Sequence, residues 1–217
     1  IESAVLTNAG GIVGLELFGT TNNKQLDGIL LTDKTALTLY YPHVAGIEWW
    51  TGIVAYNPSA SAGMITITPY SIEGTALTSS IFSIAGKGKL VDTVTGLDLP
   101  ADAAWFTITS TVPLSGFELF GTLDGNLLAP YAGSGGTGTK AGVLAKIEKS
   151  GWTGIAFVNT EAAAASVTLT AYDDTGTVKA TSVLTVNGHA KVVNNPELIF
   201  SQDISSATYI AYSSDNN

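Results

Sequence analysis

The sequence predicts an all-β protein made of two pseudo-symmetric β-sandwich units. Three observations predict this class: an internal repeat, a two-residue alternation of apolar and polar side chains, and a composition suited to strands and turns. Of the 217 residues, 45% are apolar, which is enough for a packed core, and only 12% are charged. The chain has 24 glycines, which supply turns, and it is rich in the β-branched and aromatic residues that favour pleated surfaces.

The repeat appears when the sequence is shifted against itself by 102 residues. Residues 14–20 (GLELFGT) then meet 116–122 (GFELFGT), and residues 50–53 meet 152–155, both of which read WTGI. No gap is needed between residues 46 and 91. The structural repeat positions that matter most below are Glu16 with Glu118, Trp50 with Trp152, and Asn57 with Asn159. We expect two superposable units in which paired positions have equivalent environments.

The phase of the repeat predicts the domain boundaries. Residues 46–149 make a first complete unit, whereas residues 150–217 lack a GFELFG segment of their own. Residues 1–45 contain one. We expect 1–45 to pack into the second unit and close it, with residues 14–19 as a strand there, because an unpaired strand edge is a liability. The rivals are a simple head-to-tail pair of units and a swapped dimer in which the N-terminal strand docks onto a neighbouring molecule.

The periodicity within a unit is two, which indicates strands rather than helices. Residues 65–70 and 167–172 alternate apolar side chains with Thr and Tyr. The continuous apolar runs at 53–56 and 155–158 predict central strands that are buried on both faces. The repeated Asn that follows each run can end the strand with an Asx turn.

Four short motifs carry a family resemblance: YPHVA at 41–45, WWTGI at 49–53, NP at 57–58 and GFELFG at 116–121. They resemble a tandem all-β module found in predicted secreted and surface proteins of bacteria, over nearly the whole chain. The resemblance implies an exported, non-catalytic module and transfers no site residues. The second unit departs from it, because residues 143–147 read VLAKI where the first unit has YPHVA. Any function that needs His43 would therefore reside in the first unit.

Charge and composition exclude several function classes. The net charge of −9 disfavours nucleic acid and anionic membrane surfaces as partners, because like charges repel. Cysteine is absent, which excludes disulfides, thiol catalysis and cysteine-ligated metals. No apolar run approaches the roughly 18–20 residues that span a bilayer. We expect an extracellular or cell-surface location, with the periplasm as an alternative, and no cofactor.

Glu16 and Glu118 each lie inside an apolar strand, where a carboxylate is costly to bury unless it is paired or hydrogen-bonded. Two carboxylates in one site can perform acid–base or glycosidic chemistry. These two, however, occupy equivalent positions in separate units. We therefore expect both to be buried for structural reasons, accepting hydrogen bonds or pairing with Lys89 or Lys191.

Tyr40, Tyr41, His43 and Trp49 form the candidate ligand-binding patch. Aromatic rings beside a histidine can make a platform for stacking sugars, and the alternative is that they cap the core. His189 lies in a turn far along the chain, so the two histidines do not make a metal site. The chain has no Gly-x-Ser-x-Gly nucleophile motif. We expect neither catalysis nor an intrinsic metal.

The sequence thus predicts a non-catalytic structural or adhesive interaction module of a secreted or cell-surface bacterial protein. The alternative is a carbohydrate-binding module that uses exposed aromatics. A glycan or another surface protein is the expected partner. The two hypotheses differ in whether the aromatic patch is exposed and concave or buried in the core.

Overall fold

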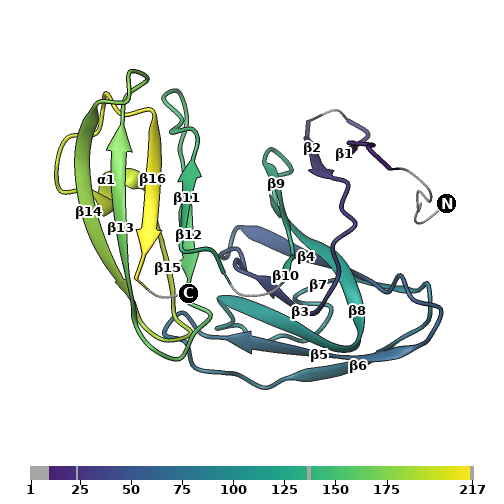
Figure 1. Cartoon of the computed structure of the whole chain (residues 1–217). Helices are drawn as coiled ribbons and strands as arrows, with labels where there is room; N and C mark the ends of the chain where they lie inside the picture. Colours follow the sequence, from purple (N-terminus) through teal and green to yellow (C-terminus); the bar gives the residue numbers. More distant parts are fainter. Residues whose placement is uncertain (1–9, 23, 136–137, 216–217) are drawn as a thin grey trace.

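The computed structural model describes residues 10–22, 24–135 and 138–215, and its regular structure is almost entirely β (Figure 1). The all-β prediction is confirmed. One short helix, α1 (Pro196–Ile199), begins at a proline. The strands are β1 (Leu15–Gly19), β2 (Leu26–Leu30), β3 (Ala36–Tyr41), β4 (Trp49–Tyr56), β5 (Gly63–Tyr70), β6 (Ser80–Ile84), β7 (Lys89–Thr93), β8 (Trp105–Thr122), β9 (Leu128–Ala132), β10 (Ser134–Gly135), β11 (Ala141–Leu144), β12 (Ile155–Val158), β13 (Ala165–Tyr172), β14 (Val178–Val186), β15 (Lys191–Asn194) and β16 (Tyr209–Ser214).

The first unit, β3 to β10, is organised around the 18-residue strand β8. The first part of β8 pairs with β3 and β5, and its second part pairs with β4 and β9. Pro113 lies between the two parts and cannot donate a ladder hydrogen bond, which suits a change of partner. The two sheets therefore curl around one core. The core comprises Leu39, Tyr41, Ile53, Ala55, Ile65, Ile67, Ile84, Leu97, Phe106, Ile108 and Leu114.

The second unit, β11 to β16, has a four-stranded antiparallel sheet in the order β11–β16–β13–β14 and a two-stranded sheet of β12 and β15. Its core comprises Ile147, Ile155, Val167, Leu169, Ala171, Ala180, Val186, Ile199, Phe200, Ile204, Ala207 and Ile210. No strand of the described residues pairs with the other edge of β12. The prediction that 155–158 is a central strand buried on both faces is wrong, because β12 lies at an edge and Ala156 is exposed.

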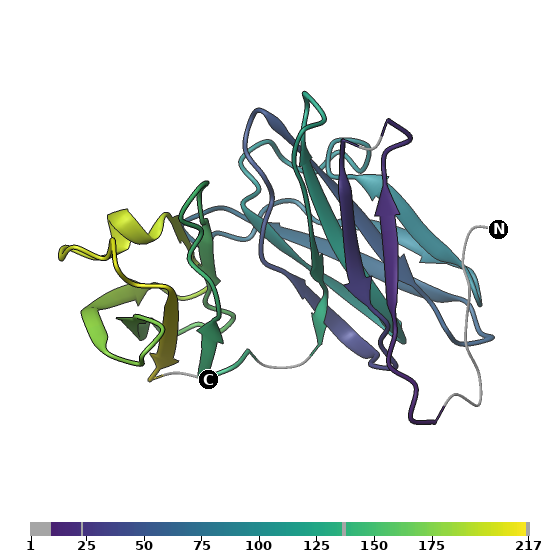
Figure 2. The ribbon, with the colours of Figure 1, turned by 90° about the horizontal axis from the view of Figure 1, so that it is seen from above.

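The N-terminal hairpin, β1 and β2, pairs only with itself in the described residues. It contacts the first unit through Gln25 and Phe18. Gln25 Nε2 donates to the Leu127 carbonyl at 2.6 Å, and the Phe18 and Phe117 rings stack at 6.1 Å. Figures 1 and 2 show it on the side of the first unit away from the second unit.

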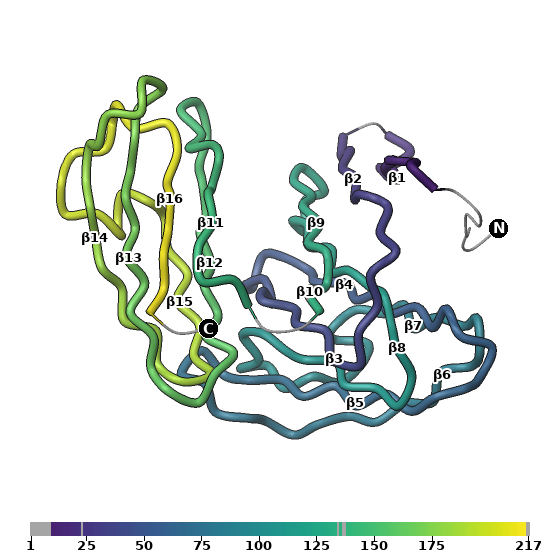
Figure 3. The backbone as a smooth tube through the Cα atoms, in the orientation of Figure 1, coloured from purple at the N-terminus to yellow at the C-terminus, as the bar shows by residue number. Residues whose placement is uncertain are grey.

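The predicted closure of the second unit by residues 1–45 is therefore not what the structure shows. The physical reason is the chain path that Figure 3 traces: a short link leads from the hairpin directly into β3, and β3 pairs with β8 in the first unit. The predicted boundaries 46–149 and 150–217 plus 1–45 differ from the strand pairing for the same reason. β3 belongs to the first unit, and β11 to the second.

Some pairs of repeat positions have equivalent surroundings in the two units, and others do not. Asn57 donates to the carbonyls of Ser61 and Ala85, and Asn159 donates to those of Ala163 and Asn187, each 102 residues later. Both Asn side chains also accept the amide two residues on, the predicted Asx turn. The tryptophans are unlike: Trp50 is half-buried in β4, whereas Trp152 precedes β12 and is 59% exposed.

Candidate functional site

A groove of about 710 Å³, here called the inter-unit groove, runs between the first and second units. The first unit contributes the loop after β3, which carries His43 and Trp49, and the hairpin of β8 and β9. The second unit contributes Trp152, β12, β15 and the first turns beyond β15. The walls therefore come from segments far apart in the sequence, and the alternation along each strand decides which side chains face in.

Aromatic rings form much of the groove wall. The Trp49 ring makes edge contacts with Phe120, at 6.4 Å between centroids, and with Trp152, at 6.2 Å. The His43 ring meets Phe120 edge-on at 5.1 Å. Such edge-to-face contacts add to the burial of the rings themselves. Trp152 remains 59% exposed and is the most accessible aromatic ring of this cluster.

Glu118 lies at the floor of the groove and is completely buried. It sits in β8 opposite Ile53 of β4 and Tyr131 of β9. Neither carboxylate oxygen has a hydrogen-bond partner. Burial raises the pKa of Glu118 to about 8. The Lys191 charge and the His43 backbone amide, which lies near the carboxylate but outside hydrogen-bond geometry, oppose this rise with smaller effects.

Lys191, in β15 of the second unit, places its ammonium near Glu118 and His43. Its ammonium donates to His43 Nδ1 at 2.6 Å and to the Ala104 carbonyl at 2.8 Å, and its backbone amide donates to the Ile72 carbonyl at 2.9 Å. Burial lowers the pKa of Lys191 to about 8, against the opposing effect of Glu118. Through its ammonium and its backbone amide, Lys191 thus ties β15 of the second unit to three segments of the first.

His43 is neutral under ordinary conditions because burial, and then the Lys191 charge, lower its pKa to about 4. A neutral ring can accept a hydrogen bond at Nδ1, which fits donation from the ammonium. Trp105 adds a second junction bond, donating from Nε1 to the His189 carbonyl at 2.9 Å. The charged groups near the groove are therefore held in the contact between units.

This arrangement can bind an apolar or aromatic surface against the groove wall. A buried carboxyl with a raised pKa also occurs in catalytic sites, but structural ion-pair networks perturb pKa values in the same way. Among the described residues, no group of three or more His, Asp or Glu side chains could hold a metal ion. The chain has no cysteine to offer instead.

The predicted ligand patch is divided by the fold. His43 and Trp49 line the inter-unit groove. Tyr41 is completely buried, donates to the Val54 carbonyl at 3.0 Å and stacks on Phe106 at 4.7 Å, so it serves the core. Tyr40, the next residue on the opposite face of β3, is half-buried and lines a different pocket.

The two glutamates also separate. Glu118 is buried as predicted, but the expected hydrogen-bond partners are absent. Glu16 is exposed, which contradicts the prediction, because the N-terminal hairpin does not enter a core. Lys191 was predicted only as one possible partner of a glutamate. Lys191 lies near Glu118 and His43 because of how the two units meet, and the local sequence does not show this.

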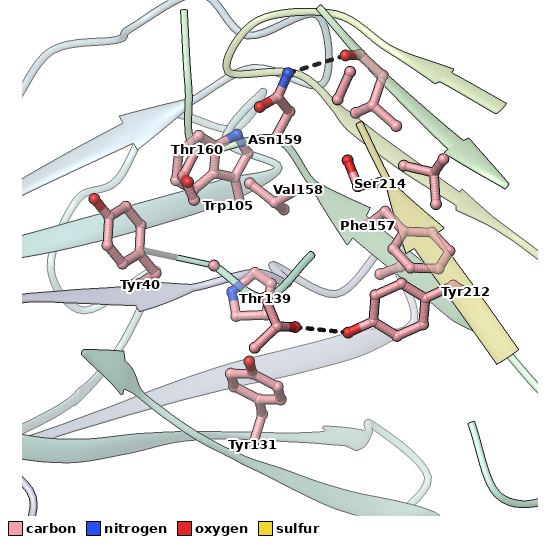
Figure 4. A pocket seen from close by; sticks show the side chains of 16 residues that line it. Tyr40, Trp105, Tyr131, Thr139, Phe157, Val158, Asn159, Thr160, Tyr212 and Ser214 are labelled. Carbon is pink, nitrogen blue, oxygen red and sulfur yellow. Dashed lines mark hydrogen bonds between the residues drawn. The ribbon is translucent and has the colours of Figure 1, made fainter. Parts of the chain in front are cut away.

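A smaller pocket of about 250 Å³, here called the core opening, lies beside the free edge of β12 (Figure 4). One wall comes from the second unit and includes the buried side chains of Val167 and Val186. The other wall comes from the first unit and consists of Tyr40, Pro42, Trp105 and Tyr131. Phe157 and Tyr212 meet edge-on at 5.3 Å, and the Tyr212 hydroxyl lies 2.8 Å from Thr139 Oγ1. The core opening is therefore a space between the two units, beside the edge of β12 that has no partner strand in the described residues.

Comparisons with known proteins do not assign a function to this chain. No family model matches the chain, and no curated protein matches it. A solved structure described as Thermotoga maritima 1070 is similar over 48% of this chain and 97% of its own length, with 14% sequence identity and a TM-score of 0.42. That similarity is too weak to carry a functional argument. In the described residues, no helix has the length and apolar character needed to cross a membrane.

Proposed function

We propose that the chain is a non-catalytic structural or adhesive module of a secreted or cell-surface bacterial protein, and that it holds copies of that protein together. The observation that carries the proposal is the inter-unit groove, whose wall is aromatic and open to solvent at Trp152. Exposed apolar surface that is concave and built from rigid strands is typical of protein-binding sites.

The chemistry of the groove supports a binding role over catalysis. Glu118 lacks any donor to position it, and the Lys191 ammonium is already held by a carbonyl and an imidazole. A general acid or base needs hydrogen-bond access to a substrate. The Lys191 ammonium instead spans the junction, where its hydrogen bonds hold the two units together.

The test is bead clustering with the purified chain. Beads coated with the wild-type chain are expected to cluster, and beads coated with Trp152→Ala are expected to cluster several-fold less, because aromatic anchors dominate protein contacts. Val183→Ala is the matched control, because Val183 is also 59% exposed but lies on β14, outside both pockets. Wild-type beads that stay dispersed, or equal clustering by Trp152→Ala, would contradict the proposal.

Carbohydrate binding is the second candidate, and one observation favours it. Trp49 and Trp152 meet at 84° with Trp152 largely exposed, which leaves a ring face available for a sugar. Polar groups of Asn194 and Asn195 lie along the same groove. A glycan array probed with the wild-type chain and with Trp152→Ala separates the candidates. Sugar binding requires a signal that this substitution removes.

A further inference from the structure

The N-terminal hairpin has the same strand register as the β8–β9 hairpin, which completes a sheet of the first unit. In the first unit, the second part of β8 lies between β4 and β9 and completes that sheet. Leu15 pairs with Leu30 in the N-terminal hairpin, and Phe117 pairs with Ala132 in the β8–β9 hairpin, 102 residues later at both ends. The β1–β2 hairpin therefore repeats the register of the β8–β9 hairpin, but in the described residues it joins no larger sheet.

The second unit has the receptor for such a hairpin. Ile155 pairs with Asn194 in β12–β15, as Ile53 pairs with Asp92 in β4–β7, again 102 residues apart at both ends. β4 has a second neighbour in β8, but β12 has none in the described residues. We propose that the N-terminal hairpin of one chain docks on the free edge of β12 in a second copy and completes its sheet. This inference rests on the adhesive function proposed above and names the contact.

The first unit supplies the expected register. Val54 of β4 lies opposite Phe117 of β8. Shifted by 102 residues, Ala156 of the acceptor lies opposite Leu15 of the donor. Strands β1 and β12 then run antiparallel, as β8 and β4 do, and form the ladder hydrogen bonds that the edge of β12 lacks.

The docked hairpin would also close the core opening. Leu114 precedes the sealing hairpin of the first unit and is completely buried in its core. The residue 102 positions earlier is Ile12, which is 63% exposed in the single chain. The matching place in the second unit is the core opening beside β12, where Phe157, Val167 and Val186 provide apolar surface. Filling it with Ile12 removes apolar surface of both chains from water.

Apolar side chains along the hairpin are otherwise left in water. Leu15, Leu17 and Leu26 are 55%, 64% and 72% exposed. Their counterparts Phe117, Leu119 and Leu128 are all half-buried against the first unit. Contiguous exposed apolar surface of this kind marks an interaction site.

A second copy fits better than the chain's own hairpin. His43, just after β3, contacts the second unit, so the hairpin leaves from the opposite end of this six-residue strand, about 20 Å away. The link of residues 31–35 spans at most about 18 Å. Reaching its own β12 would require that link to run back fully extended along the first unit. A second copy meets no such constraint.

Disulfide trapping tests the contact, because the chain has no cysteine of its own. One chain carries Leu15→Cys and a size tag, and the other carries Ala156→Cys. Directly opposed residues in antiparallel strands lie within disulfide reach. Under mild oxidation we expect a mixed dimer of about twice the 22.3 kDa chain mass. Val143→Cys is the matched control, because Val143 is 59% exposed on the edge strand β11. Docking should make trapping at Ala156 about tenfold faster than at the control.

Each outcome decides the inference. Faster mixed-dimer formation with Ala156→Cys than with Val143→Cys supports it. Equal rates overturn it. A Leu15→Cys/Ala156→Cys double variant that closes only within one chain shows that the chain's own hairpin is the occupant, which also overturns it. If trapping fails but coated beads still cluster, the hairpin contact is wrong and the adhesive function stands.

Discussion

Replacing Glu118 by Gln should stabilise the protein in a pH-dependent way. Glu118 is completely buried without a hydrogen-bond donor, and its pKa is raised from 4.5 to about 8, chiefly by burial. Between these pH values the unfolded chain has released the proton and the folded chain has kept it. The free energy of unfolding therefore falls as pH rises through this window, by about 1.4 kcal/mol per unit at most. Gln has no such proton, so the variant should gain about 2–5 kcal/mol over wild type by pH 7.5.

Urea unfolding followed by tryptophan fluorescence measures this difference at a series of pH values. At pH 4 the two proteins should have nearly equal stability, because protonated Glu and Gln are close in shape and polarity. The lowered pKa of His43 makes stability rise between pH 4 and 6.5 in both proteins, so it cancels in the comparison. Glu16→Gln, at the exposed equivalent position, should show no pH-dependent gain. A difference for Glu118→Gln that does not grow with pH, or a less stable variant at pH 7.5, would refute the reasoning.

Three further predictions concern packing and hydrogen bonds, each measured by the same unfolding assay. Leu114→Ala should cost about 2–5 kcal/mol through the cavity it leaves, whereas Ile12→Ala should cost little in dilute, single chains. Asn57→Ala and Asn159→Ala should each cost about 1–3 kcal/mol, because each removes the side-chain partner of several backbone groups: two carbonyls and one amide at Asn57, and three carbonyls and one amide at Asn159. Trp105→Phe should cost about 1 kcal/mol and speed hydrogen exchange in residues 188–190, because it removes one junction hydrogen bond.

Local patterns predicted much of the fold. The alternation at 65–70 and 167–172 is the alternation of buried and half-buried residues in β5 and β13. The two Asn turns also follow from short-range chemistry, since an Asn side chain binds its own backbone wherever the strand ends. Tyr41 was wrongly predicted to be part of the ligand patch, although the alternation along β3 is what sends it into the core. These features depend on residues a few positions apart, which sequence shows directly.

Features that depend on which strands become neighbours were not predictable in this way. β4 and β12 have similar apolar sequences, yet β4 is central and β12 is an edge, because only β4 receives a hairpin in the described structure. Glu118 and Glu16 sit in nearly identical motifs and have opposite exposure for the same reason. Whether a repeated residue is buried depends on which strand pairs with its own strand. The repeat shows that a suitable partner strand is present in the sequence, but not that the two strands pair.

The hydrogen bonds of Lys191 make the junction between units selective as well as adhesive. A buried ammonium is costly unless its hydrogen bonds are satisfied, and an apolar side chain of similar size would often stabilise the fold as well or better. Because the ammonium comes from β15 and its acceptors, His43 Nδ1 and the Ala104 carbonyl, lie in the first unit, these bonds form only when the units meet in this orientation. An apolar groove alone would accept several orientations, since burial of apolar surface is not directional. The Lys191 hydrogen bonds therefore fix the relative position of the units, with Ile155 and Ala156 of β12 beside the inter-unit groove.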